Sequence, residues 1–323
     1  MRSIVFSKEL LKLDCARETE RIVTTLRECV LRRFKKRGLV VAISGGIDSS
    51  VVAALAVRAF GAERVLAVLM PEKDSCPETL PLSREVVESL KIASVTEDIT
   101  RILEAAGCYR RRDDAIRLAL PDYTADWKSK IVLPSVAESD QYRLFALVAQ
   151  SPEGSVVKAR LPLEAYLGIV AASNFKQRTR KMLEYYHADR LNYAVSGTPN
   201  RLEYDQGFFV KGGDGAADVK PIAHLYKTQV YQMAEYLKVP DRVRSRPPST
   251  DTYSLPQSQE EFYFSVPFEK MDLIMYGKDH GFAPAEIGTV VGLDEVQVGR
   301  VFRDIDSKRR MAHYLHSQAV IVE

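Results

Sequence analysis

The chain has 323 residues, 46% of them hydrophobic, and is long enough to bury one large core or two smaller ones. A net charge of +3 is too small to indicate a nucleic-acid partner. The four cysteines have no metal-ligand spacing, the charged N-terminus cannot be a signal peptide, and no apolar run approaches the roughly 20 residues of a membrane span. These features predict a cytoplasmic protein with no membrane partner.

The first predicted element is an amphipathic helix over residues 7–37, with a broken apolar stripe. The apolar run 39–43 then predicts a buried parallel strand, which stops at Ser44-Gly45-Gly46. From Ile47 onward apolar residues recur at helical spacing. A strand therefore enters a helix through a glycine-rich turn.

Such a turn directs several backbone N–H groups and the positive end of the helix dipole at one point, which predicts an anion site. Glycines allow a phosphate to approach the backbone closely, and Ser44, Ser49 and Ser50 add hydroxyl donors. Asp48 is unexpected beside a phosphate, but a Mg²⁺ ion bridging carboxylate and phosphate would explain it. The alternative is an ordinary strand–helix turn without a ligand.

Further strands are predicted at 64–70, 94–99 and 192–196, with a helix at 78–91 between the first two. Strands that alternate with helices predict an α/β fold with a doubly wound parallel sheet, whose ligands bind at the carboxyl ends of the strands. Residues 108–170 break this pattern and are predicted to be an insertion that carries a β-hairpin, with arms at 142–149 and 155–160.

Residues 281–310 have the pattern of two short helices joined at a glycine. A DNA-binding helix-turn-helix is one interpretation, but acidic residues on the second helix favour a helical hairpin that packs on the body. We therefore expect three parts: an N-terminal helix (1–37), an α/β domain (38–280) and a C-terminal helical segment (281–323).

The segment 44–50, Ser-Gly-Gly-Ile-Asp-Ser-Ser, resembles the SGGxDS loop of the ATP pyrophosphatases. These enzymes split ATP between the α and β phosphates and grip the departing pyrophosphate with this loop. The segment is not a P-loop, because no Gly-Lys-Ser/Thr follows, and it lacks the Gly-x-Gly-x-x-Gly of a Rossmann fingerprint.

Four later segments resemble the ammonia-dependent NAD synthetases within that superfamily. They are 174–180 (N-x-K-A-R-x-R in the family), 196–203 (G-T-x-x-x-x-E), 207–222 (G-F-F-T-K-Y-G-D-G-x-x-D-x-x-P) and 225–230 (L-x-K-x-Q). Residues 246–251 resemble the family's K-x-P-T-A-D loop, which is mobile over the active site, and Lys308 resembles the lysine of a late H-K-R. These matches and the first loop cover most of the chain.

The resemblance implies an enzyme that adenylylates a carboxylate, deamido-NAD, and amidates it with ammonia, using ATP and Mg²⁺. The implied ATP- and pyrophosphate-binding set is Ser44, Gly45, Gly46, Ser49, Ser50, Arg178, Thr198, Lys227 and Ser249. The implied acceptor-binding set is Asn174, Lys176, Phe208, Lys211, Asp214, Asp218 and Lys308. Asp48 and Glu203 are the implied Mg²⁺ ligands, and the expected catalytic residues are Asp48, Lys227 and, as a candidate general base, Asp214, with Asp251 as the alternative base.

Departures from the family pattern gather on the acceptor side. Gly212 stands where the family usually has tyrosine, Ser307 replaces the late histidine, and the insertion has no counterpart in the short bacterial enzymes. A paralogue that amidates another carboxylate is therefore one alternative. A tRNA-modifying ATP pyrophosphatase is a second, although the C-x-x-C cysteines and the basic surface expected of it are absent. A non-catalytic binding protein that uses the helix-turn-helix is a third.

The nitrogen source is expected to be free ammonia or ammonia from a separate glutaminase partner, because the first 38 residues cannot hold a glutaminase domain. The family resemblance implies a homodimer.

Overall fold

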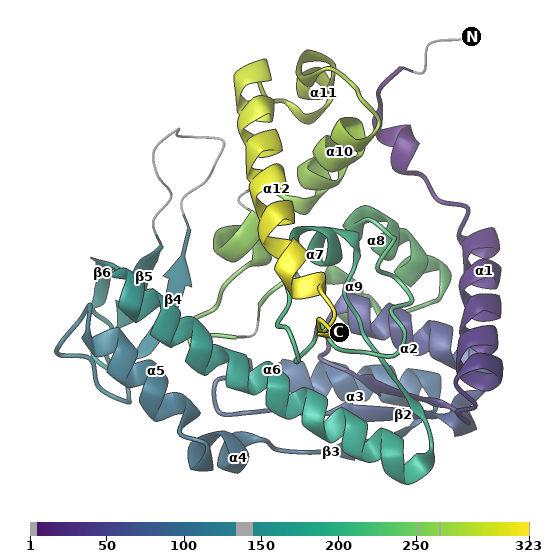
Figure 1. The fold of residues 1–323 in the computed structure, drawn as a ribbon, viewed down its shortest axis with the longest axis horizontal. Coiled ribbons are helices and arrows are strands. Elements are labelled where there is room, and N and C mark those ends of the chain that lie inside the picture. The colour runs from purple at the N-terminus through teal and green to yellow at the C-terminus, as the bar shows by residue number, and fades with distance from the viewer. Residues whose placement is uncertain (1–4, 134–144, 251, 265, 323) are drawn as a thin grey trace.

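The computed structural model describes residues 5–133, 145–250, 252–264 and 266–322 (Figure 1). At its centre lies a four-stranded parallel sheet in the order β3-β2-β1-β7. The strands are β1 (Leu39–Ala42), β2 (Val65–Leu69), β3 (Ala93–Thr96) and β7 (Ala194–Ser196). Leu39 of β1 pairs with Val65 of β2 and with Ala194 of β7.

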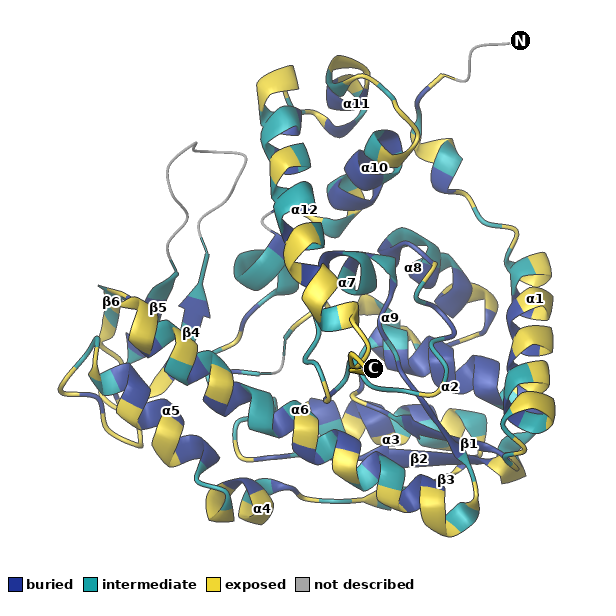
Figure 2. Cartoon of the chain, viewed as in Figure 1, coloured by how far each residue is buried: buried dark blue, intermediate teal, exposed yellow. Residues whose placement is uncertain are grey.

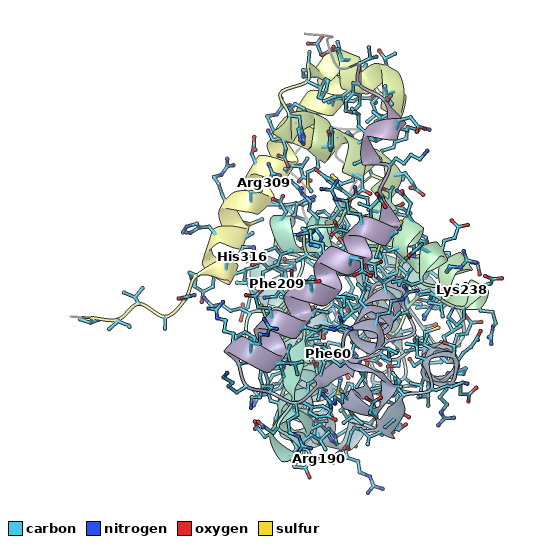
Figure 3. All side chains as sticks on the ribbon, turned by 90° about the vertical axis from the view of Figure 1, so that its right-hand side faces the viewer. Phe60, Arg190, Phe209, Lys238, Arg309 and His316 are labelled. Atoms are coloured by element: carbon cyan, nitrogen blue, oxygen red, sulfur yellow. The ribbon has the colours of Figure 1, made fainter. Side chains whose placement is uncertain are left out.

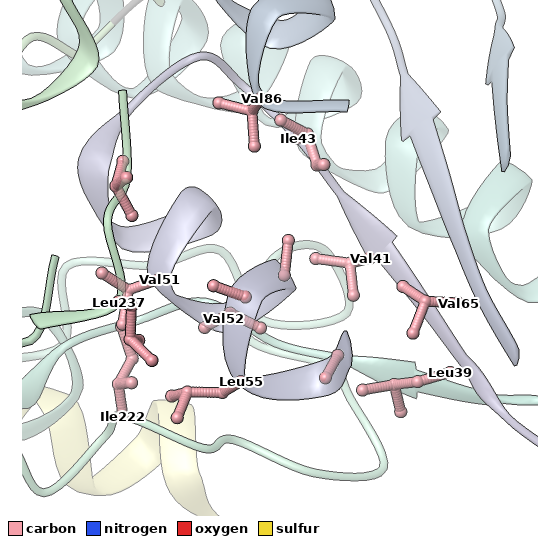
Figure 4. Packing of buried hydrophobic residues seen from close by; sticks show 14 of the residues in the cluster. Leu39, Val41, Ile43, Val51, Val52, Leu55, Val65, Val86, Ile222 and Leu237 are labelled. Carbon is pink, nitrogen blue, oxygen red and sulfur yellow. The ribbon is translucent and has the colours of Figure 1, made fainter. Parts of the chain in front are cut away.

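Helices cover both faces of this sheet. Leu39 and Val41 of β1 belong to the apolar core shared with α1 (Cys15–Arg27), α2 (Ile47–Phe60), α3 (Thr79–Leu90) and α8 (Lys227–Tyr236), part of which is seen in Figure 4. Val40 faces the opposite side, which is packed by α4 (Thr100–Ala105), α5 (Cys108–Arg117) and α6 (Leu163–Leu191). The predicted doubly wound α/β fold is confirmed, and burial is densest on β1, β2 and the helix faces toward them (Figure 2).

The single N-terminal helix predicted over 7–37 is wrong. A 3₁₀ turn at Lys8–Leu11 precedes α1, and a π-helical turn at Glu28–Arg33 follows it. Asp14 explains the break, because its side chain caps the start of α1 by accepting from the N–H of Arg17 at 3.1 Å. The N–H of Leu13 donates instead to Gln232 on α8, at 2.9 Å.

The insertion contains the predicted hairpin, formed by β5 (Ala146–Gln150) and β6 (Val156–Arg160), although residues 142–144 of its expected first arm lie outside the described residues. A third strand, β4 (Lys128–Val132), pairs antiparallel with β5 and was not predicted. Its sequence Lys-Ser-Lys-Ile-Val is short and carries two lysines, so its strand character depends on pairing with β5. Residues 163–170, assigned to the insertion, form the first turns of α6.

The C-terminal segment forms a helical hairpin of α11 (Pro284–Val291) and α12 (Glu295–His316), joined through Gly292 at a φ of +68°. It packs on α10 (Phe268–Asp279), and α12 also contacts α7 (Arg201–Gln206). The predicted length of the second helix is wrong, because α12 has 22 residues and is not a short helix. Figure 3 shows its last turns beside Phe209, whose ring lies 5.1 Å from that of His316.

Helix α9 (Asp241–Ser245) follows α8, a 3₁₀ turn (Ala62–Arg64) precedes β2, and a π-helical turn (Glu260–Phe264) precedes α10. None of the helices in the described part of the chain combines the length and apolarity needed to cross a bilayer. The boundaries of the three parts proposed from the sequence stay a prediction.

Candidate active site

A cavity of about 430 Å³ lies at the carboxyl ends of the parallel strands. Ile43 and Ser44 enter it from the end of β1, Met70 from the end of β2 and Gly197 from the end of β7. This is the edge at which doubly wound sheets bind ligands. Helix α6, the segment 207–214 and the segment 246–263 supply the other walls.

The loop at residues 44–50, here called the phosphate loop, is held by its own hydroxyl groups. The Ser49 hydroxyl accepts from the Ser44 N–H at 3.3 Å and donates to the carbonyl of Gly46 at 3.0 Å. Ser50 donates to the same carbonyl at 2.8 Å. Ser44, Gly46, Asp48 and Ser49 line the cavity, whereas Gly45 and Ser50 support the loop from behind.

Gly45 is required by its surroundings. Its φ is +69°, and a Cβ atom added there would lie 2.7 Å from the carbonyl oxygen of Thr79. A larger residue would therefore combine backbone strain with a clash against the start of α3. The phosphate loop can keep its shape only if this position is glycine.

Asp48 and Lys227 form an ion pair inside the site, between the start of α2 and the start of α8. The second carboxylate oxygen of Asp48 accepts from the Asn200 amide at 3.0 Å. Asn200 also caps α7, and its N–H donates to Glu203 at 3.1 Å. Gln259 donates to the other oxygen of Glu203 at 2.9 Å. Asp48 and Glu203 are thus held beside one buried lysine.

A buried carboxylate behind the site fixes the position of Lys227. Asp272 on α10 accepts from the backbone N–H of Lys227 at 3.2 Å and from that of Thr228 at 2.6 Å, so it caps α8. Burial raises the pKa of Asp272 to about 7 despite these donors. No sequence pattern indicates this role of Asp272, because its partners are backbone groups 44 and 45 residues away.

The pKa values of Glu203 and Lys227 depend on burial and on the charges of their neighbours. Burial, and then the nearby charge of Asp48, raises the pKa of Glu203 to about 7. Burial lowers the pKa of Lys227, but Asp48 and Glu203 outweigh this effect and raise it overall. At neutral pH the lysine is a cation between two carboxyl groups, one of which gives up its proton only near neutrality.

This donor set fits a magnesium ion. Mg²⁺ in phosphate-transfer sites is held by one or two carboxylates, with substrate phosphate oxygens and water completing its shell. Asp48 and Glu203 are such a pair, and both line the cavity beside the phosphate loop. No three His, Cys, Asp or Glu side chains gather as a metal cage anywhere in the described residues.

Helix α6 presents one polar face to the cavity, and this face differs from the predicted one. Asn174 lines the cavity as predicted, together with Gln177, Arg180 and Lys181. Arg178 does not line it, because its guanidinium points to the carbonyl of Lys211, at 3.3 Å. The helical period explains the difference: positions 173, 177, 180 and 184 share a face, and 178 lies outside it.

The segment 207–220 supplies two of the four acceptor-side residues predicted there. Phe208 and Asp214 line the cavity, and burial raises the pKa of Asp214. Asp218 lies outside, where it accepts from the N–H of Val195 at 2.7 Å and so joins this segment to β7. Lys211 also lies outside, and its ammonium donates to the carbonyl of Tyr314 at 2.9 Å.

The two other lysines predicted to bind the acceptor are buried elsewhere. Lys308 donates to Asp304 at 2.6 Å and to the carbonyl of Tyr263 at 2.7 Å. Lys176 is enclosed by Glu72, Asp74 and the carbonyl of Thr252. Neither lysine lines the cavity, whereas Thr198 and Ser249 of the predicted ATP set do.

An aromatic wall runs along the cavity, and most of its residues were not predicted from the sequence. Phe145 and Tyr166 stack with ring centroids 4.4 Å apart, and Phe145 lies 6.4 Å from Phe262. Phe262 in turn lies 5.8 Å from Phe208. The aromatic wall comprises Phe145, Tyr166, Phe208, Tyr253, Phe262 and Tyr263. Only Phe208 stood in a recognisable motif.

A family model described as NAD synthase matches residues 18–125 and 152–313. The chain belongs to the NAD synthase family. Its relatives include an NH(3)-dependent NAD(+) synthetase of Rhizobium meliloti, 57% identical over 99% of this chain and 96% of that protein. A protein of the same name from Thermotoga maritima is 34% identical over 79% of this chain and 85% of its own length.

Solved structures of lower identity share the fold of this NAD synthase family member. An NH3-dependent NAD synthetase from Campylobacter jejuni has a TM-score of 0.62 at 21% identity, covering 97% of this chain and all of that one. An NMN synthetase from Francisella tularensis has a TM-score of 0.67 at 22% identity, covering 96% and 99%. A glutamine-dependent enzyme from Acinetobacter baumannii matches over 97% of this chain but 47% of its own, with a TM-score of 0.53 at 20% identity.

Proposed function

We propose that this protein is an ammonia-dependent NAD synthetase. It uses ATP to activate the carboxylate of deamido-NAD and then amidates it with ammonia, giving NAD, AMP and pyrophosphate. The observation that carries the proposal is the Asp48–Lys227 ion pair beside Glu203 and the phosphate loop. Relatives of this name are up to 57% identical over nearly the whole chain.

In the first step the deamido-NAD carboxylate attacks the α-phosphorus of ATP, and pyrophosphate departs. The leaving group carries several negative charges, and stabilising it as it departs is the main contribution expected of the protein. The phosphate loop offers N–H and hydroxyl donors, and Lys227 offers a buried ammonium at the same edge of the sheet. Arg180 and Lys181 on α6 add positive charge along the cavity.

Asp48 and Glu203 would hold Mg²⁺. When bound, the ion neutralises phosphate charge and so favours departure of pyrophosphate. Asp48 and Lys227 hold each other in place through their ion pair.

In the second step ammonia attacks the acyl-adenylate and AMP departs. No covalent nucleophile is needed, and Asp214 is the candidate base for removing a proton from ammonium. The alternative base, Asp251, lies outside the described residues. Burial raises its pKa, which brings it closer to a group that can accept a proton near neutral pH. Asn174 and Phe208 are the remaining predicted acceptor residues that line the cavity.

The two alternative activities are not favoured. Some of the departures from the family pattern that suggested a paralogue lie outside the cavity, such as Gly212 and the segment around Lys308. Substitutions at these positions therefore do not indicate a different carboxylate substrate. The tRNA-modifying alternative lacked its cysteine motif, and the relatives with high identity carry the NAD synthetase name.

We also propose that the protein acts as a homodimer and takes free ammonia or ammonia from a separate glutaminase. Exposed Leu163, Leu167, Met182 and Tyr186 on α6 support a dimer, because large apolar side chains on one surface helix favour burial against a partner. A cytoplasmic location stays a prediction.

The test is product analysis with ATP, Mg²⁺, deamido-NAD and ammonium chloride. We expect AMP, pyrophosphate and NAD in equal amounts, and no NAD when glutamine replaces ammonium. Formation of ADP and orthophosphate would contradict the proposed bond cleavage. Turnover with the deamidated form of NMN but not with deamido-NAD would instead support the paralogue.

A further inference from the structure

Lys176 is a buried cation that the proposed reaction does not use. Its side chain is 2% exposed and lies on the middle turns of α6, outside the cavity. The ammonium donates to Glu72 at 2.8 Å, to Asp74 at 2.7 Å and to the backbone carbonyl of Thr252 at 2.8 Å. An ammonium has three donors, so the group is saturated and has no capacity left for a substrate.

The two carboxylates that hold Lys176 are themselves fixed. The Tyr109 hydroxyl donates to Glu72 at 2.7 Å, and Arg112 donates to Asp74 at 2.5 Å. Although burial raises the pKa of Asp74, Lys176 and Arg112 outweigh it and lower that pKa. Both Tyr109 and Arg112 come from α5, at the start of the predicted insertion. The ionic cluster therefore joins α5, α6 and the segment after β2.

The third acceptor belongs to a different part of the molecule. Thr252 lies in the segment 246–258, of which Ser249, Thr250, Thr252 and Tyr253 line the cavity. On its other side this segment is tied to β4, since Ser254 accepts from the N–H of Ser129 at 2.8 Å. The cavity-lining part of the segment is thus held between an ammonium and the insertion sheet.

We propose that Lys176 is a positioning residue, whose ammonium fixes the carbonyl of Thr252 and so keeps the cavity-lining residues Ser249, Thr250, Thr252 and Tyr253 in their binding geometry. The two carboxylates hold the Lys176 ammonium in one place and balance its charge. The ammonium can therefore hold the Thr252 carbonyl in one position through a charge-assisted hydrogen bond. The inference uses the proposed function only for its substrate, ATP.

The test uses the double variant Lys176→Met/Asp74→Asn, which removes one charge of each sign and so limits the penalty for unpaired buried charge. We expect hydrogen exchange of the backbone amides 252–255 to quicken at least tenfold, with exchange in the phosphate loop unchanged. We expect the KM for ATP to rise about tenfold with kcat within threefold, because saturating substrate restores the competent geometry.

The matched control is Asp113→Asn. Asp113 is 5% exposed and accepts from Arg112 at 2.9 Å within the same ionic cluster, whereas the three donors of Lys176 go to Glu72, Asp74 and Thr252. It should leave exchange at 252–255 and the KM unchanged. If the double variant fails to fold, Lys176→Arg is tested instead. It keeps the charge, but a longer, planar guanidinium cannot meet three acceptors that converge on one nitrogen atom, so a three- to tenfold rise in the KM for ATP is expected.

Unchanged exchange at 252–255 in the folded double variant overturns the inference. Wild-type exchange together with a wild-type KM for ATP in Lys176→Arg also overturns it. Uniformly faster exchange over the whole sheet would indicate a general stabilising role and overturns it as well. The exchange experiment needs no substrate. A protein that makes no NAD would therefore refute the proposed function and leave this inference to be decided separately.

Discussion

The phosphate loop and the aromatic wall line the same cavity but are built in different ways. The phosphate loop is one run of seven residues that offers backbone N–H groups and short hydroxyls, and its shape is set by a strand, a glycine and a helix start. The aromatic wall is assembled from five separate stretches of chain, between Phe145 and Tyr263, and acts through side-chain surfaces.

This difference predicts which residues of the cavity can be substituted without loss of substrate binding. A site made of backbone groups depends on local geometry, so single residues such as Gly45 cannot vary. A site made of flat side chains depends on area and stacking, which several residue types can supply. We therefore expect substitutions in the phosphate loop to affect ATP cleavage strongly and substitutions in the aromatic wall to affect acceptor affinity mildly.

The largest expected effect comes from Asp48→Asn. Loss of this carboxylate removes the partner of Lys227 and one proposed Mg²⁺ ligand, so AMP formation should fall by about 10²–10³-fold, the usual cost of losing one group that stabilises the transition state. The rate is measured with labelled ATP. Asp241→Asn, at an exposed position on α9, is the control and should retain full activity. Unimpaired AMP formation by Asp48→Asn would remove the phosphate loop from the reaction.

The second effect is a pH dependence of Mg²⁺ binding. Glu203 has a pKa raised to about 7, and only its ionised form can bind the cation, so protonation competes with the metal. The apparent Kd for Mg²⁺ should therefore increase by up to about tenfold per pH unit as pH falls below 7, and it should level off above pH 8. Calorimetric titration with a non-hydrolysable ATP analogue measures it. Glu203→Gln should bind Mg²⁺ more weakly with a flatter profile, and an equally steep profile there would assign the titration to another group.

The third effect distinguishes two costs of a side chain at Gly45: the strain of a positive φ and the steric clash with the Thr79 carbonyl. Gly45 and Gly154 have φ values of +69° and +90°, but an added Cβ meets the Thr79 carbonyl only at Gly45 and has open space at Gly154. Gly45→Ala should lower the free energy of unfolding by about 1–3 kcal/mol more than Gly154→Ala does. Denaturant unfolding measures both. Equal losses would mean that the Thr79 backbone yields freely.

The smallest effect tests the aromatic wall. Phe145→Ala removes one stacked pair, worth about 0.5–1.5 kcal/mol, so the KM for deamido-NAD should rise roughly two- to tenfold while the KM for ATP changes less than twofold. Steady-state kinetics with each substrate varied in turn measures this. Phe145→Tyr keeps the ring and should restore the affinity. An equal rise in both KM values would show that the two ends of the cavity are not independent.

Several residues show which parts of the fold and of the candidate site could be predicted from the sequence. The parallel sheet, the phosphate loop and the cavity positions of Asp48, Lys227 and Glu203 could be predicted, because they follow strand ends in short motifs with fixed spacing. Arg178, Lys211, Asp218 and Lys308 stood in motifs too, yet they make contacts outside the cavity. A motif identifies a segment, but the helical period and the packing of that segment decide which of its side chains face the ligand.

The sequence by itself determined the local geometry: apolar runs made the buried strands, and the glycine-rich turn made the phosphate loop, because both depend on neighbours in the chain. Only the tertiary structure decided the rest. It brought Asp272 behind Lys227, enclosed Lys176 between Glu72, Asp74 and Thr252, and joined Phe145 to Phe262. Contacts of this kind link residues far apart in the chain, and no local pattern records them, because their energy comes from burial and charge pairing that exist only after folding.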